Sequence, residues 1–141
     1  MDDEDLRIIV ELFDYIGDKI LKTAEITLKI YENLTIVEAN ALYVIGPHEP
    51  KTMKQIAEAL GVAVSTPTRT IDRLVGKGLV TRKVAKKDRR KLLIELTPEG
   101  KDLLERMDEE GISMARKMFE NLQDEEIATL KKILLKISEK L

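Results

Sequence analysis

A short, strongly basic segment is the part of this sequence whose residue types most clearly point to a chemistry. Residues 82–91 hold seven Lys or Arg side chains and a single Asp. Over residues 69–91, ten basic and two acidic side chains give a formal charge of +8; because the whole chain carries −2, the remainder carries −10. Clustered Lys and Arg neutralise phosphates and release their counterions, so this segment predicts a surface that binds nucleic acid. A solvated basic face is the usual alternative for a charge run alone, and the surrounding elements decide between the two.

The sequence around the basic segment predicts a β-hairpin with a charged tip. The runs LVTRKV, residues 79–84, and KLLIEL, residues 91–96, are strand-like and flank the tip AKKDRR, residues 85–90. Thr97 then predicts the cap of a new helix, with Pro98 well placed at its first position. A hairpin of this kind gathers the basic side chains at one exposed end.

Two short helices are expected before the hairpin, the first over residues 52–62. Thr52 and Gln55 are spaced as a capping box, in which each side chain satisfies a backbone N–H group of the first turn. Gly61 is placed to adopt the left-handed conformation that ends the helix. Two short helices around a glycine turn form a helix-turn-helix, to which the hairpin is appended.

The second short helix follows a tight turn and is expected to span residues 65–77. Pro67 has no backbone N–H group and is tolerated only in the first turn, which favours a cap near Ser65. Ala63 and Val64 remain alternative starts. This helix would present polar and basic side chains directly upstream of the basic hairpin.

Long amphipathic helices flank the central unit. Apolar residues recur at helical spacing over residues 4–32, and Thr35 with Glu38 predicts a second capping box at the start of the next helix. In the C-terminal helix the apolar residues step by three and four, as in a coiled coil. The residues expected to form a seam between helices are Leu6, Ile9, Ile127, Leu130, Leu134, Ile137 and Leu141.

These elements predict a mainly α fold with a small β-hairpin wing (α+β), that is, a dimeric winged helix-turn-helix. The terminal helices are too long to bury both faces against the central unit, and pairing with a second chain is the economical solution. We therefore expect residues 1–34 and 101–141 to be dimerisation helices and residues 35–100 to be a DNA-binding lobe. The alternative is a compact monomer whose terminal helices pack on each other.

The composition excludes several classes of site. The chain has no Cys and a single His, His48, so there is no disulfide framework, thiol sensor or His-rich metal site, and we expect no cofactor. No Ser/His/Asp set or Gly-rich phosphate loop points to an enzyme. No apolar run approaches 18 residues and the N-terminus MDDEDLR is acidic, so we expect a cytoplasmic protein without a membrane anchor.

The hairpin and the helix before it resemble the MarR family of bacterial and archaeal transcription regulators. Asp88, Arg90, the pair Leu96-Thr97 and Gly100 stand at that family's spacing, and IDRLVGKGLVTR, residues 71–82, looks like its recognition helix running into the first wing strand. The resemblance covers nearly the whole chain. It implies a winged-helix homodimer with interleaved terminal helices that regulates transcription, with repression as the expected action. A two-fold dimer in turn implies a palindromic operator.

An α-helix fits the major groove of double-stranded DNA, where each base pair shows a distinct pattern of donors and acceptors. Arg69 is expected to read guanine, and the Thr methyls and the Pro67 ring to touch a thymine methyl. By resemblance, Arg90 enters the minor groove. Asp88 is expected to orient an arginine, either Arg90 or one on the recognition helix; a simple turn residue is the alternative. The expected DNA-binding residues are Ser65, Thr66, Thr68, Arg69, Thr70 and Arg73 on the helix and Lys86, Lys87, Arg89 and Arg90 on the wing.

By the same resemblance, an effector pocket lies between the terminal helices and the DNA-binding lobe. Without Cys or a His cluster, the remaining effectors are an apolar or phenolic small molecule, an acyl chain, or none at all. Residues 34–46 look faintly like the second helix of MarR-type repressors of fatty-acid synthesis genes, which answer to acyl-carrier-protein-linked chains. A core or surface role is the common alternative for such side chains. The expected pocket residues are Phe13, Tyr15, Ile16, Tyr31, Asn40, Tyr43 and His48.

A winged helix can also serve as a protein-interaction module without reading DNA. That alternative predicts a neutral or acidic wing, whereas residues 85–90 of this sequence are strongly basic. The charge of the hairpin therefore favours double-stranded DNA as the partner.

Overall fold

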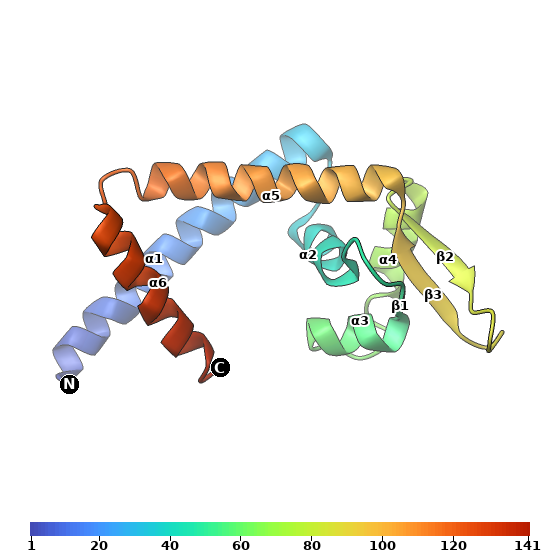
Figure 1. Cartoon of the computed structure of the whole chain (residues 1–141), viewed down its shortest axis with the longest axis horizontal. Coiled ribbons are helices and arrows are strands. Elements are labelled where there is room, and N and C mark those ends of the chain that lie inside the picture. Colours follow the sequence, from blue (N-terminus) through green and yellow to red (C-terminus); the bar gives the residue numbers. More distant parts are fainter. The chain divides into compact units, whose positions relative to one another are not determined.

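The computed structural model describes residues 1–30 and 32–141, which are mostly helical with one small antiparallel sheet (Figure 1). The predicted mainly helical fold with a β-hairpin wing is confirmed. The chain divides into two compact units, residues 1–101 and 102–141. In chain order the elements are α1 (Asp3–Thr27), η1 (Leu28–Glu32, a π-helix), α2 (Ile36–Ile45), β1 (Lys51–Thr52), α3 (Met53–Leu60), α4 (Thr68–Gly76), β2 (Val80–Val84), β3 (Leu92–Leu96), α5 (Pro98–Met118) and α6 (Asp124–Ser138).

The first long helix forms where the apolar periodicity predicts it, but its last turn is wider. Asp2 caps α1 by accepting a hydrogen bond from the backbone N–H of Glu4 at 3.1 Å. The helix continues into η1 and ends at Asn33, which adopts the left-handed conformation with φ 51°. Asn tolerates this conformation better than most residues, so it provides the stop that glycine provides elsewhere.

Along α1 none of the described residues is buried within the chain. Apolar side chains such as Ile9 and Phe13 are exposed, although they repeat at helical spacing. On the polar face the Asp18 carboxylate accepts a hydrogen bond from Lys22 Nζ at 2.9 Å, and this bond and the carboxylate's charge raise the pKa of Lys22 above its usual range. An amphipathic helix that leaves its apolar stripe uncovered needs a further partner surface.

The core of the first unit lies between α2, α3, α4 and the sheet. The predicted inward residues Ala39, Leu42 and Ile45 of α2 are buried. The largest fully buried side chains are Leu42, Ile45, Ile56, Ile71, Leu74 and Ile94. These residues come from α2, α3, α4 and β3, so the two short helices and the wing are held by one shared core.

The sheet has the strand order β1-β3-β2, with both pairs antiparallel. In the predicted hairpin, Val80 lies opposite Leu96 and Val84 lies opposite Leu92. The strand β1 was not predicted, because two residues are too short to show a period. It pairs Lys51 with Ile94 and so fixes the start of α3 against the hairpin.

Of the two predicted capping boxes in this unit, one is confirmed and one is wrong. At α3, Thr52 Oγ1 accepts from the Gln55 N–H at 3.2 Å and Gln55 Oε1 accepts from the Thr52 N–H at 2.9 Å. At α2, Thr35 Oγ1 does accept from the Glu38 N–H at 3.1 Å. The Glu38 carboxylate, however, accepts from the Thr35 hydroxyl at 3.3 Å and pairs with Lys77, so it does not return to the Thr35 backbone.

The junction between the hairpin and α5 is tightly packed. Thr97 caps α5 as predicted, since its Oγ1 accepts from the Gly100 N–H at 3.1 Å. The same hydroxyl donates to the Gly78 carbonyl at 2.6 Å. A Cβ on Gly100 would lie 2.1 Å from the Leu79 carbonyl oxygen, so only glycine fits this close approach of two backbones.

The second unit consists of most of α5 and the whole of α6. Leu103 and Met107 on α5 are buried. The first turn of α6 is closed by a capping box between Gln123 and Glu126, which the sequence reading missed because Gln is an uncommon cap. Within the part of the chain that the structure describes, no helix combines the length and the apolar character needed to span a bilayer.

Candidate nucleic-acid interface

The recognition helix α4 begins later than the sequence predicts. Its cap is Pro67 rather than Ser65, and its first residue is Thr68. Ser65 lies in the preceding turn, in which the Thr66 N–H donates to the Ala63 carbonyl at 2.9 Å. Because Pro67 cannot donate a backbone hydrogen bond, the helical pattern starts only when its carbonyl accepts from Ile71 at 2.9 Å.

Most of the predicted polar residues around α4 are exposed, as a DNA-contacting surface requires. Two expectations of exposure are wrong. Thr70 is only 7% exposed, because it lies on the same side of α4 as the core residues Ile71 and Leu74. The Pro67 ring is also buried, so it is not displayed to a thymine methyl. The exposed residues are Ser65, Thr66, Thr68, Arg69 and Arg73.

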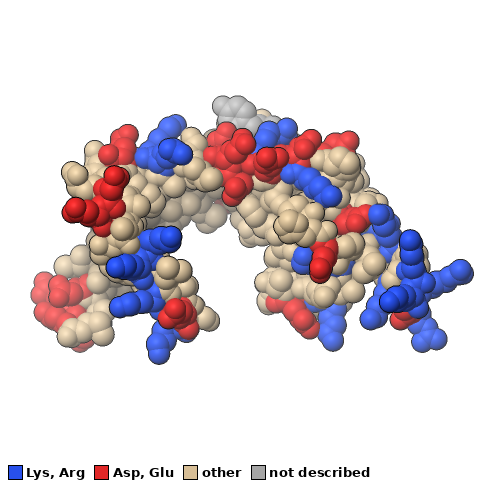
Figure 2. Space-filling model, in the orientation of Figure 1, with Lys and Arg blue, Asp and Glu red and all other residues tan. Residues whose placement is uncertain are grey.

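The wing carries the most concentrated positive charge of the first unit. Figure 2 shows Lys and Arg side chains gathered over the β2–β3 hairpin, at the right of the view. Among the described residues, no ion pair involves any of these tip cations. The predicted tip residues are all exposed, namely Lys86, Lys87, Arg89 and Arg90.

Asp88 shapes the turn at the wing tip. Its Oδ1 accepts a hydrogen bond from the backbone N–H of Arg90 at 3.0 Å, and its carbonyl accepts from the Lys91 N–H at 3.0 Å. Asp is favoured in turns for this reason. The turn alternative therefore accounts for the contacts of Asp88, and the orientation of a guanidinium stays a prediction.

An ion pair between Arg82 and Asp72 joins the wing to the recognition helix, and sequence reasoning missed it. Arg82 is on β2 and Asp72 is on the solvent side of α4. A second pair joins Lys83 to Glu95 across the hairpin. Both basic residues belong to the charged segment, but their charge is used within the protein. For the Arg82–Asp72 pair, the signal in the sequence is two opposite charges ten residues apart, and this spacing does not predict an ion pair unless the fold is known.

A second unpredicted contact, the Glu38–Lys77 ion pair, lies at the other end of α4. Lys77 caps the C-terminus of α4, and its Nζ contacts Glu38 Oε2 at 2.5 Å and the Asn33 carbonyl at 2.6 Å. The Glu38 side chain is only 4% exposed. A buried carboxylate requires a partner, because removing an isolated charge from water is costly. The Lys77 contacts therefore join the C-terminus of α4 to Glu38 in the first turn of α2 and to Asn33, the residue that follows η1.

The predicted effector residues come from α1, η1, α2 and the loop that follows α2, and a shared pocket stays a prediction. Phe13, Tyr15 and Ile16 are exposed on α1, and Tyr43 is half exposed on α2. The remaining members are Asn40 and His48, which are exposed, and Tyr31, which lies outside the described residues.

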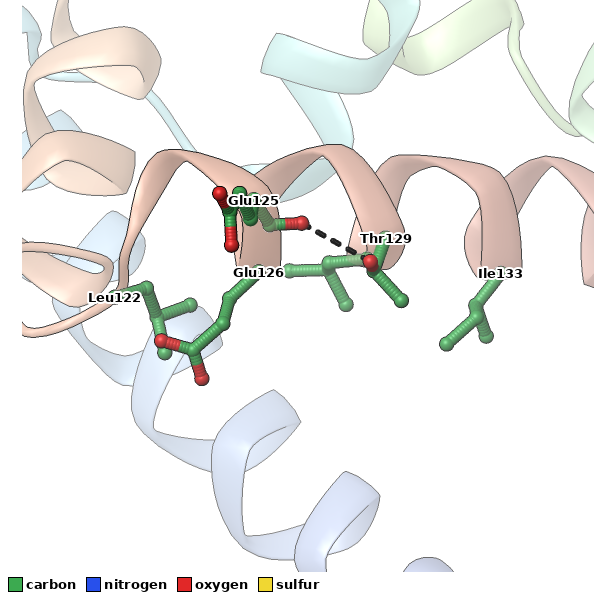
Figure 3. Close-up of a pocket in the computed structure, with 6 residues that line it drawn as sticks. Leu122, Glu125, Glu126, Thr129 and Ile133 are labelled. Atoms are coloured by element: carbon green, nitrogen blue, oxygen red, sulfur yellow. Dashed lines mark hydrogen bonds between the residues drawn. The ribbon is translucent and has the colours of Figure 1, made fainter.

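A hollow in the second unit lies elsewhere, on α6 and the turn before it. It has a volume of about 410 Å³ and is lined by Leu122, Glu125, Glu126, Thr129, Leu130 and Ile133. In Figure 3, Thr129 donates to the carbonyl of Glu125, at 3.0 Å, so this hydroxyl is satisfied within the helix. The lining includes one residue of the predicted seam, Leu130, and none of the predicted effector residues.

Comparison with known proteins agrees with this arrangement. The model of the MarR family matches residues 34–92. The uncharacterized HTH-type transcriptional regulator YsmB of Bacillus subtilis (strain 168) is 32% identical over 135 residues, which cover 96% of this chain and 87% of YsmB.

Two solved structures that contain DNA have the same fold. FabT of Streptococcus pneumoniae in complex with DNA has a TM-score of 0.85 and 26% identity, with 95% of each chain covered. The complex of S. aureus MepR with DNA has a TM-score of 0.72 and 26% identity, with 92% of this chain and 95% of MepR covered.

Proposed function

This chain belongs to the MarR family of DNA-binding transcriptional regulators, and from that premise we propose that it is a repressor that binds a palindromic operator as a homodimer. The observation that carries the proposal is the exposed surface formed by α4 and by the wing-tip cations, which form no ion pair with any residue that the structure describes. The Arg82–Asp72 ion pair joins these two elements, so they present one surface to a duplex. Residues 35–100 act as the DNA-binding lobe, and residues 1–34 and 101–141 as dimerisation helices.

In the proposed complex, α4 lies in the major groove and the wing tip reaches the adjacent minor groove. Arg69, in the first turn of α4, reads guanine through its O6 and N7 acceptors. Lys86, Lys87 and Arg89 neutralise phosphates, and Arg90 enters the minor groove, where the potential is most negative. Ser65 and Thr66 contact the backbone from the turn before α4.

The operator is tested by fluorescence anisotropy with DNA from the gene's own upstream region, against scrambled DNA, over a salt series. We expect preferential binding to the upstream DNA, with an affinity that falls steeply as salt rises, because each neutralised phosphate releases counterions. If both DNAs are bound equally, sequence-specific autoregulation is excluded. If neither DNA is bound at low salt, the proposal of DNA binding is wrong, and a protein-interaction module becomes the favoured function.

The homodimer is supported by the apolar surface that the single chain leaves exposed. On α6, Leu134 and Ile137 of the predicted seam are exposed, and on α1 so are Leu6 and Ile9. Exposed apolar stripes on two long helices are typical of an interface between subunits.

Replacing Leu134 with Glu should therefore dissociate the dimer, because it places a charge within the apolar seam. Light scattering should show the mass falling from twice the chain mass to the chain mass of 16.1 kDa, together with weaker operator binding. Lys132→Glu, on the opposite face of α6, is the control and should leave the mass unchanged. A Leu134→Glu protein that keeps the parental mass would rule out this seam.

An apolar, phenolic or acyl effector would release the repressor by a shift between two conformations. Such a ligand must bind one spacing of the two recognition helices better than the other, since equal affinity shifts no equilibrium. The exposed aromatic residues Phe13, Tyr15 and Tyr43 would contribute to its pocket together with the surface of the second chain. If long-chain acyl carriers change neither the melting temperature nor the operator affinity, the acyl class is excluded.

A further inference from the structure

The wing has one face that is directed toward the recognition helix. Side chains alternate between the two faces of a strand, so Val80, Arg82 and Val84 of β2 share a face with their partners on β3. Arg82 on this face reaches Asp72 of α4. At its inner end Val80 and Leu96 are buried in the core that includes α4. We refer to this side of the hairpin as its helix-facing side.

The apolar character of the helix-facing side continues beyond the core. Val84 and Leu92 lie directly opposite each other at the outer end of the two strands. They are 54% and 52% exposed, whereas Ile94, one step further in on the same face, is 1% exposed. About half of each side chain of this apolar cross-strand pair is therefore open to a partner, next to tip cations that form no ion pair among the described residues.

We propose that Val84 and Leu92 contact the deoxyribose edges of one DNA strand. This inference rests on the proposed function, in which α4 lies in the major groove and the wing tip in the adjacent minor groove. The sugar-phosphate backbone that separates two neighbouring grooves then passes between α4 and the helix-facing side of the wing. Its sugars present C–H groups, which match an apolar pair.

Charge complementarity supports DNA as the occupant. The cations Lys86, Arg89 and Arg90 follow Val84 and precede Leu92 along the chain, so they lie just beyond the apolar pair. A strand that meets the pair through its sugars meets these cations through its phosphates. The two kinds of contact act differently, because only the cations release counterions.

The test uses the double variant Val84→Thr/Leu92→Thr in the operator assay. Thr is β-branched and therefore favours a strand at both positions, and it replaces apolar surface by a hydroxyl. We expect about tenfold weaker operator binding from the apolar area lost. The dependence of affinity on salt should keep its slope. The matched control is Val37→Thr, on α2, where the valine is 60% exposed.

Hydroxyl-radical footprinting gives a second readout, because the radical cleaves DNA by removing hydrogen from exposed deoxyribose carbons. The parental protein should protect a few sugars between the two contacted grooves, and the double variant should lose that protection while the Val37→Thr protein keeps it. Circular dichroism checks that the hairpin still folds. Should the double variant unfold, the single variant Val84→Thr is measured in its place.

The outcomes separate this inference from the proposed function. If the parental protein does not prefer the operator, the proposed function fails and the sugar contact fails with it. If parent and variant bind the operator alike and give the same footprint, only the sugar contact is wrong. The inference is also overturned if the affinity of the double variant depends less steeply on salt, because the substitutions would then disturb phosphate contacts. It is likewise overturned if the mass of the variant changes, because the pair would then lie at a contact between chains.

Discussion

Replacing Lys77 with Met should lower the free energy of unfolding by about 3 kcal/mol, the lower end of the range for breaking a buried ion pair. The change leaves the Glu38 carboxylate, 4% exposed, without its cation, and removes the donor to the Asn33 carbonyl. The lower end applies because the Lys77 side chain is itself 30% exposed, so water compensates part of the loss. Chemical denaturation at a fixed protein concentration measures the effect, since the stability of a dimer depends on concentration.

Two further variants separate the ion pair from a general effect of removing a lysine. Lys54→Met, at an exposed position on α3, should change the stability by no more than about 0.5 kcal/mol. The double variant Glu38→Gln/Lys77→Met should recover part of the loss, because a neutral amide does not require a cation. If Lys77→Met and Lys54→Met are equally stable, the Glu38–Lys77 contact does not stabilise the fold.

The contrast between the two capping boxes shows which structural features can be predicted from sequence. The Thr52–Gln55 box joins residues three positions apart, and no described residue competes for either side chain. Glu38 has the same spacing from Thr35, but its carboxylate is used by Lys77, which is 39 residues away along the chain. A local pattern is therefore reliable only where no distant charge offers a stronger partner, and a single sequence does not reveal that partner.

The recognition helix was predicted correctly as an element, whereas its start and one of its faces were not. The Ile71 and Leu74 spacing establishes an amphipathic helix, and both residues are fully buried. Thr70 is adjacent to this stripe, where periodicity alone does not decide between a buried and an exposed hydroxyl. Pro67 restricts the start of the helix without specifying it, because proline is compatible both with the cap and with the first turn.

The charge count likewise predicted the basic wing but not how its charges are divided. Arg82 and Lys83 pair with Asp72 and Glu95, and this pairing depends on strand register and on the packing of β2 against α4. The tip cations beyond Val84 keep no such partner among the described residues. The cations available for DNA are thus a subset of the basic segment, and the fold selects that subset.

Replacing Arg90 with Ala should weaken operator binding about 100-fold, or by about 2.7 kcal/mol, while the proposed dimer and the stability of the protein are unchanged. Stability is preserved because the Arg90 side chain is exposed, and because the bond to Asp88 Oδ1 comes from the Arg90 backbone N–H, which alanine retains. The loss should fall mainly on specific binding, since in the proposed complex the Arg90 guanidinium enters a narrow minor groove and so reads the shape of the operator. Anisotropy at physiological salt, with operator and scrambled DNA, measures both affinities.

Lys86→Ala provides the comparison, because it removes a cation from the same tip and leaves in place Arg90, the residue that we propose for the minor groove. That variant should weaken binding to operator and scrambled DNA alike and reduce the salt slope by about 1. We expect Arg90→Ala to lose the preference for operator over scrambled DNA, and Lys86→Ala to bind both DNAs more weakly by the same factor. This difference would show that Arg90 contributes to sequence specificity, whereas Lys86 contributes only electrostatic attraction to the phosphates. An Arg90→Ala protein that binds the operator as tightly as the parent would instead place the wing tip outside the minor groove. Specificity would then rest on the exposed residues around α4.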